Sequence, residues 1–172
     1  MNNWMVQLNK YLKKQPQVTA FLAKLLNASV FGFYMSFMIQ TMVLIINDSL
    51  QRMLVFVVGI AIVFILVTLL RSLINRKRPY ETLGIAPVIP KDTKGKSFPS
   101  RHAFCAWLIA LNWLIVFHQP LSLINGTIVV IYCIFAFIVS FLRVILTLHY
   151  PSDVIAGATL ALICFIVMNG VC

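Results

Sequence analysis

The sequence predicts an all-α protein, a polytopic bundle of about five transmembrane helices preceded by an amphipathic helix at the membrane interface. Hydrophobic residues make up 61% of the 172 residues and charged residues only 10%, against about 45–50% and about 25% in soluble globular proteins. The apolar residues are gathered into long runs that contain no Lys, Arg, Asp or Glu. The length fits a single domain, residues 1–172.

Residues 1–20 differ from these runs and predict the interfacial helix. Apolar side chains recur there at helical spacing, with lysines on the other side. The apolar residues are Trp4, Met5, Leu8, Tyr11 and Leu12, and the lysines are Lys10, Lys13 and Lys14. A frayed basic tail is the alternative interpretation of this pattern.

Five apolar segments follow that suit transmembrane helices, since a hydrocarbon core about 30 Å thick needs roughly 20 apolar residues of helix. They cover residues 25–46, 53–70, 103–117, 126–142 and 154–171. The third is short unless it borrows residues from the motif before it. Pro120 and Asn125-Gly126 predict the break between the third and fourth segments.

Residues 80–98 predict the only long loop between these segments. Glycines and prolines interrupt its periodicity, and Lys91, Lys94 and Lys96 make it basic. Loops longer than about 12–15 residues are usually functional or disordered. Because this loop joins two polar clusters, we expect it to form a wall or lid over a binding site.

Three polar clusters interrupt the apolar runs between residues 71 and 153. They are Arg71-x6-Arg78-Pro79, then Pro99-Ser100-Arg101-His102, and then Arg143-x5-His149-x3-Asp153. Two membrane crossings separate the second cluster from the third, so counting helices places all three on one membrane face. Ionisable residues at membrane depth are costly and mark functional sites by default. Residues 71–153 are therefore the predicted catalytic core.

The arginines of these clusters are candidate ligands for a substrate phosphate. A guanidinium is always charged, and its planar fork binds phosphate oxygens in pairs. The four are Arg71, Arg78, Arg101 and Arg143. Ser100 and Pro151 stand where helices are expected to begin, so two positive helix ends should face the same spot. Ser100 is placed to cap its helix and to donate its hydroxyl to a phosphate oxygen.

Two histidines supply the chemistry that arginine lacks. Asp153 follows His149 at i+4, a spacing that lets the carboxylate accept a hydrogen bond from one ring nitrogen. The other nitrogen is then free to attack phosphorus. His102 remains to protonate the departing oxygen.

Each feature also has a simpler explanation. Arg76-Lys77-Arg78 is typical of a basic flank that anchors a helix. Ser100 and Asp153 are typical of helix caps, and we interpret His118 as a side chain that is hydrogen-bonded locally. The ordered occurrence of all three clusters favours catalysis.

The net charge of +10 lies beside apolar spans, which favours anionic lipids and phosphorylated substrates over nucleic acid as partners. The four cysteines lack metal-ligand spacing.

With these motifs the chain resembles the type 2 phosphatidic acid phosphatase family, which is related to the vanadium-dependent haloperoxidases. The family signatures are Lys-x6-Arg-Pro, Pro-Ser-Gly-His and Ser-Arg-x5-His-x3-Asp. The resemblance covers about half of the chain and implies a haloperoxidase-like helical core and a phosphatase without metal or cofactor that forms a phosphohistidine. It implies His149 as nucleophile, Asp153 as its orienting group and His102 as general acid. The phosphate ligands that it implies are Arg71, Arg78, Ser100 and Arg143.

Three positions depart from the signatures. Arg71 replaces lysine, Arg101 replaces glycine and Leu142 replaces serine, while the histidines and Asp153 match. Many members of the family have six spanning helices, and the segment at residues 1–20 is expected to replace the first of them here.

The resemblance implies a lipid phosphate as substrate, and phosphatidylglycerophosphate, phosphatidic acid and undecaprenyl diphosphate all fit. It places the protein in a bacterial plasma membrane with the site at the outer face. The N-terminal lysines and the positive-inside rule favour the cytoplasmic face instead. A vanadate-dependent haloperoxidase and a non-enzymatic scaffold that binds anionic lipids are the alternative functions. The sequence indicates no obligate protein partner.

Overall fold

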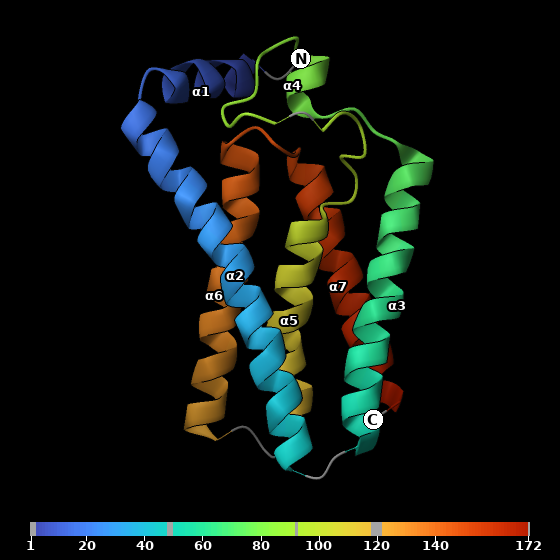
Figure 1. Cartoon of the computed structure of the whole chain (residues 1–172). Coiled ribbons are helices and arrows are strands. Elements are labelled where there is room, and N and C mark those ends of the chain that lie inside the picture. The colour runs from blue at the N-terminus through green and yellow to red at the C-terminus, as the bar shows by residue number, and fades with distance from the viewer. Residues whose placement is uncertain (1–2, 48–49, 92, 118–121, 172) are drawn as a thin grey trace.

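The computed structural model describes residues 3–47, 50–91, 93–117 and 122–171, and within these ranges it consists of helices and loops without strands. The helices are α1 (Asn3–Lys13), α2 (Pro16–Ile46), α3 (Leu50–Ile74), α4 (Pro79–Thr82), α5 (Arg101–Phe117), α6 (Leu123–Ile145) and α7 (Pro151–Val171). Figure 1 shows α2, α3, α5, α6 and α7 as an elongated bundle, with α1 lying across one end of it. The predicted all-α membrane bundle is confirmed.

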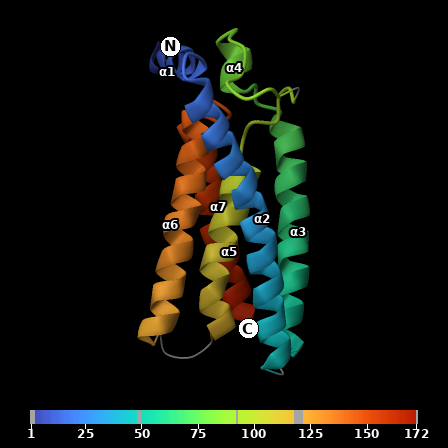
Figure 2. The same cartoon turned by 60° about the vertical axis from the view of Figure 1, so that its left-hand side comes forward.

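The shortest of the long helices, α5, lies at the centre of the bundle and packs against α2, α3, α6 and α7. Figure 2 shows it enclosed by its neighbours from a second direction. Within the described ranges four helices are long and apolar enough to cross a membrane, whereas α5 has only 17 residues. It begins at Arg101, so it does borrow residues from the motif before it. Because its neighbours separate it from lipid, its own length does not have to match the bilayer thickness.

The boundary between α1 and α2 differs from the expected one. Residues 1–20 were expected to belong to a single interfacial helix, but α1 ends at Lys13 and Pro16 opens α2. Proline favours the first helical position because it has no N–H to leave unpaired and its φ is already helical. The Thr19 hydroxyl donates to the Leu12 carbonyl at 2.7 Å and fixes the corner between the two helices.

The apolar side of α1 packs onto the bundle end, because Met5 and Leu12 are buried. Asn9 on this helix donates to the Ala86 carbonyl at 3.3 Å and to the Thr147 hydroxyl at 3.2 Å. These contacts join α1 to the long loop and to the turn between α6 and α7. A position of α1 in the membrane interface stays a prediction.

Gly157 allows α7 to approach the start of α5 closely. A Cβ at this position would lie 2.7 Å from the Ser100 carbonyl oxygen and 3.2 Å from the Phe104 nitrogen. We expect Gly157→Ala to destabilise the protein by about 1–3 kcal/mol, as overpacking of a well-packed core does. Thermal unfolding of purified protein in detergent measures the effect. Gly126→Ala is the matched control, since nothing lies within 4 Å of that Cβ, and equal midpoints for the two variants would contradict the predicted close approach.

Candidate active site

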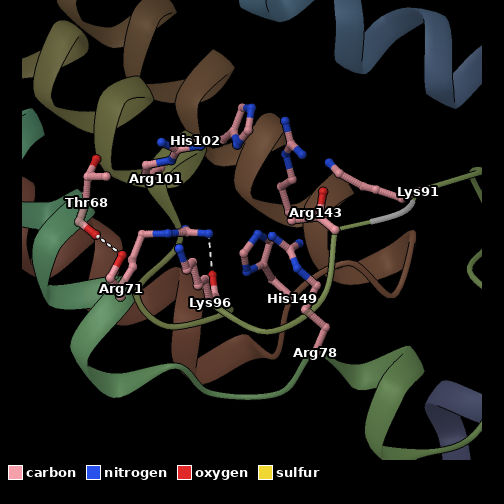
Figure 3. Close-up of a pocket in the computed structure, with 11 residues that line it drawn as sticks. Thr68, Arg71, Arg78, Lys91, Lys96, Arg101, His102, Arg143 and His149 are labelled. Atoms are coloured by element: carbon pink, nitrogen blue, oxygen red, sulfur yellow. Dashed lines mark hydrogen bonds between the residues drawn. The ribbon is translucent and has the colours of Figure 1, made fainter.

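The three polar clusters meet at the bundle end that carries α1 and α4, where they line a cavity of about 230 Å³. Figure 3 shows side chains from α3, α5, α6 and the adjoining loops converging on it. The lining residues are Thr68, Arg71, Ser72, Arg78, Lys91, Thr93, Lys96, Arg101, His102, Arg143 and His149. Among these described lining residues six are lysine or arginine and none is acidic. Such a cavity needs an anion to balance its charge.

His149 and Asp153 form the pair that their spacing predicted. His149 Nδ1 lies 3.5 Å from Asp153 Oδ2 and 3.4 Å from the Ser97 hydroxyl. The Ser97 hydroxyl donates to Asp153 Oδ2, and the Tyr150 N–H donates to the same oxygen at 3.0 Å. These contacts occupy the Nδ1 edge of the ring. Nε2 has no hydrogen-bond partner among the described residues and remains for the cavity that His149 lines.

The turn that presents His149 has an unusual backbone. Thr147 has a positive φ of 55°, which is an outlier for a β-branched residue. The N–H groups of Leu148 and His149 both donate to the Arg143 carbonyl at 3.1 Å, closing the end of α6. The bond from Asn9 to the Thr147 hydroxyl holds this turn from the side. The end of α6, the turn and α1 together therefore fix the position of the imidazole.

The pKa of His149 is lowered to about 4, chiefly because burial disfavours the imidazolium. The hydrogen bond to Asp153 opposes this shift, while Arg78 and Arg143 add to it. The ring is therefore neutral near pH 7. A neutral ring whose Nδ1–H faces Asp153 carries its lone pair on Nε2, as a nucleophile requires.

Arg71 and Arg78 are held by carbonyls of the long loop and its neighbours. Arg71 Nη1 donates to Pro99 O at 2.6 Å and Nη2 donates to Lys96 O. Arg78 Nε donates to Gly95 O at 3.2 Å and Nη1 to Leu148 O at 3.3 Å. Both guanidinium groups are buried. The loop is thus wrapped around two arginines and forms a wall of the cavity, as the sequence predicted.

The beginning of this loop differs from the prediction, since Pro79–Thr82 forms the helical turn α4. The cause is a capping box, in which Glu81 Oε2 accepts a bond from the Arg78 N–H at 2.8 Å. The same oxygen accepts a bond from the Gly95 N–H at 2.8 Å, and Gly95 adopts a positive φ of 61°. Glu81 therefore ties the two ends of the loop together.

Arg101, Arg143 and Lys91 line the cavity with donors that no described residue accepts. Arg143 is buried and its Nε has no partner among the described residues. Arg101 lies with its Cζ 5.5 Å from the centre of the Phe64 ring, beside Arg71 in Figure 3. The pKa of Lys91 is lowered to about 8, first by burial and then by Arg143 and other arginines. These free donors are suited to the oxygens of a phosphate.

The second cluster is divided between the cavity and the layer beneath it. His102 lines the cavity from the first turn of α5. Ser100 is buried outside the lining, where its N–H donates to the Asp153 carbonyl at 2.9 Å. Its hydroxyl accepts a long bond of 3.5 Å from the Ala103 N–H, which is a weak cap for α5. The phosphate contact expected of Ser100 stays a prediction. His118 lies outside the described residues.

Sequence reasoning missed several residues of the site. Ser97, which joins Asp153 to His149, gave no signal beyond its place in the loop. Lys91 and Lys96 were recognised only as part of a basic loop, but both line the cavity. Arg76 was explained as part of a basic flank that anchors a helix, but its Nη1 donates to Asp153 Oδ1 at 2.7 Å.

Comparison with known proteins agrees with this arrangement. The family model described as the PAP2 superfamily matches residues 52–171. The crystal structure of the first transmembrane PAP2 type phosphatidylglycerolphosphate phosphatase from Bacillus subtilis is similar, with 25% identity, a TM-score of 0.69 and coverage of 98% of this chain and 84% of that one. The crystal structure of Aquifex aeolicus LpxE shares the fold, with 21% identity, a TM-score of 0.62 and coverage of 96% and 94%. No curated protein sequence matched the chain.

The family match extends over more than half of the chain and contains all three polar clusters. The apolar helices and the cation-lined cavity fit the same assignment. The chain therefore belongs to the PAP2 superfamily and is a membrane phosphatase, a hydrolase of phosphoric esters.

Proposed function

We propose that the protein hydrolyses a lipid phosphate through a phosphohistidine on His149. In the first step Nε2 attacks phosphorus, the bond from phosphorus to the lipid oxygen breaks, and His102 gives its proton to that oxygen. In the second step water attacks the phosphohistidine, His102 takes a proton from the water, and inorganic phosphate leaves. After the first step His149 carries the phosphoryl group and His102 has lost its proton, and the second step returns both residues to their starting states.

The observation that carries this proposal is that both histidines line one cavity together with six cations. Arg78 and Arg143 lie close enough to His149 to affect its ionisation. Fixed cations of this kind stabilise the charge on the phosphoryl oxygens in the transition state. The approach of a phosphate dianion also favours the protonated form of His102, which the first step requires.

We propose further that the reaction needs no divalent metal, because the lining offers cations in the place where a metal-dependent phosphatase needs anionic ligands. Phosphate release from a panel of lipid phosphates by purified protein tests the proposal. We expect turnover to persist in EDTA and to be inhibited by vanadate, a mimic of the five-coordinate phosphorus of the transition state. Turnover that requires an added divalent cation would overturn it.

The substrate class follows from the surroundings of the cavity. Phe64 on α3 is 41% exposed and lies beside Arg101, so the cavity that Arg101 lines adjoins an apolar surface suited to a lipid tail. Phosphatidylglycerophosphate, phosphatidic acid and undecaprenyl diphosphate are the substrates to compare. The first and third carry a second phosphate group that the remaining donors of the cavity can bind.

Substitution of Arg101 tests this use of the additional cations. We expect Arg101→Ala to lower kcat/KM about 10–100-fold for undecaprenyl diphosphate, because a charge-assisted bond to the second phosphate is lost. The loss should be clearly smaller for phosphatidic acid, which has one phosphate. Parallel assays on both lipids measure the difference. The control is Arg52→Ala, which removes the same charge at the end of α3 away from the cavity. Equal losses on both lipids in Arg101→Ala would contradict the assignment.

We place the protein in a bacterial plasma membrane with the cavity at the outer face. The lysines of α1 oppose this orientation, because α1 lies at the same end as the cavity. Tyr11 is exposed on α1, so a Tyr11→Cys variant can report the orientation. Labelling of intact cells by a membrane-impermeant maleimide supports the outer face, and labelling only after lysis overturns it.

A further inference from the structure

Arg76 lies behind the catalytic pair and does not line the cavity. It stands between α3 and α4, where its Nη1 donates to Asp153 Oδ1 at 2.7 Å and to the Ser152 hydroxyl at 2.9 Å. Its Cζ lies 4.3 Å from the centre of the Tyr150 ring. Its carbonyl accepts a bond from the Ser97 N–H at 2.9 Å. The residue thus contacts the turn that carries His149 and the loop that carries Ser97.

We propose that Arg76 is a positioning residue for the hydrolysis. Arg76 fixes the Asp153 carboxylate against His149 and balances the charge of that carboxylate, so that the imidazole stays neutral until it attacks phosphorus. The inference rests on the proposed phosphohistidine mechanism and adds to it a residue that never touches the substrate.

The two oxygens of Asp153 have separate tasks. Oδ1 receives Arg76, whereas Oδ2 receives the Ser97 hydroxyl and the Tyr150 N–H and faces His149 Nδ1. A carboxylate with only one fixed oxygen can rotate about its last bond. With both oxygens fixed, Oδ2 keeps the position that orients the ring and leaves Nε2 for the phosphate.

The charge balance around the pair supports the second part of the proposal. Asp153 is completely buried, and among the described residues its only ion pairs are those with Arg76 and His149. Without Arg76, the nearest group able to neutralise this carboxylate would be the imidazole, which would then be favoured as a cation. An imidazolium has no lone pair on Nε2 and cannot attack phosphorus. Because Arg76 neutralises Asp153, the imidazole does not have to bind a second proton to balance the carboxylate.

Other titratable groups act on the pair from α3, α5, α6 and the N-cap of α4. Arg78 and Arg143 act on His149, which in turn acts on His102, and Arg71 and Arg78 act on Asp153. Arg71, Arg78 and Arg143 all line the cavity, so a bound phosphate dianion offsets their effect on the pair. Arg76 lies outside the lining and keeps its pairing with Asp153 when substrate is present. It is the cation best placed to keep the pair balanced during binding.

The test compares Arg76→Gln, Arg76→Lys and the control Lys77→Gln, assayed for kcat, KM and the pH dependence of kcat/KM on one lipid phosphate. Lys77 is the neighbouring exposed cation, so its variant has the same change of net charge. Because the substrate is the same throughout, its own ionisation cancels in the comparison. Thermal unfolding in detergent shows whether each variant is folded.

We expect Arg76→Gln to lower kcat about 10–100-fold, as loss of a positioning contact does, with KM changed less than about twofold because the phosphate ligands are intact. The acidic limb of the kcat/KM profile of Arg76→Gln should move up by about one pH unit, because a partly exposed cation (38% exposed) no longer opposes protonation of His149. Arg76→Lys keeps the charge at one point, so the limb should stay in place while kcat falls several-fold. Lys77→Gln should match the wild type.

Other results separate this inference from the proposed function. An acidic limb that stays in place in Arg76→Gln, or moves equally in Arg76→Lys, would overturn the charge-balancing role. Wild-type kcat in both Arg76 variants would overturn the positioning role. If Arg76→Gln does not fold, Arg76→Lys decides by the same two readouts. If the wild type itself releases no phosphate, or does so equally with His149→Ala, the proposed function fails first.

Discussion

Replacement of His149 by alanine is expected to lower phosphate release at least about 10⁴-fold, because a covalent nucleophile is lost and not merely a binding contact. The six cations that line the cavity are unchanged in this variant, so the dissociation constant for inorganic phosphate should change less than about tenfold if the arginines supply most of the binding, as proposed. Single-turnover assays and equilibrium binding on the same preparation measure the two effects. Turnover at more than a few per cent of the wild-type rate would contradict a nucleophilic His149.

The pH dependence of the wild type belongs to the same prediction. Because the pKa of His149 is lowered to about 4, the neutral ring is lost only as the pH falls through that value. A histidine with an unperturbed pKa would lose its neutral form near pH 6.5. We therefore expect kcat/KM to persist at pH 5 to 6 after correction for the ionisation of the substrate phosphate. An acidic limb at the ordinary histidine pKa would show that the nucleophile is not the buried imidazole.

Replacement of His102 by alanine is expected to lower the rate about 10²–10⁴-fold with a lipid substrate, the usual contribution of general acid catalysis. The departing lipid oxygen is a poor leaving group without a proton. With p-nitrophenyl phosphate the leaving oxygen needs no proton, so the loss should be at least about tenfold smaller. Steady-state assays on the two substrates provide the comparison.

This substrate comparison also separates the role of His102 from a structural one. Misfolding, or loss of a phosphate contact, would reduce both reactions equally. Equal losses would therefore contradict the assignment of His102 as general acid, and His102 would then be a binding residue of the cavity that it lines.

Much of this site was predictable because its residues lie at helix ends in a chain whose crossings can be counted. The spacing of His149 and Asp153 predicted their pairing, and the positions of the three clusters predicted a common face. The length of the loop and its position between two clusters predicted a wall or lid, and the loop forms a wall. These inferences depend on sequence separation along helices, which a membrane bundle translates directly into position.

The unpredicted features depend on how the loops fold. Ser97 meets Asp153 only because Arg71, Arg78 and Glu81 wrap the loop around the cavity. The ion pair of Arg76 with Asp153 crosses 77 positions of the sequence, and a basic helix flank has the same local pattern. The separation of α1 from α2 at Pro16 could have been recognised from the preference of proline for the first helical position.

Detection of the phosphorylated intermediate tests the central claim most directly. Protein mixed with a ³²P-labelled lipid phosphate and quenched in alkali within one turnover should carry one label, stable to alkali and labile to acid, on the peptide that contains His149. The His149→Ala variant should carry none. Full single-turnover hydrolysis without any labelled protein, or a label on a residue other than His149, would contradict attack by this imidazole on phosphorus.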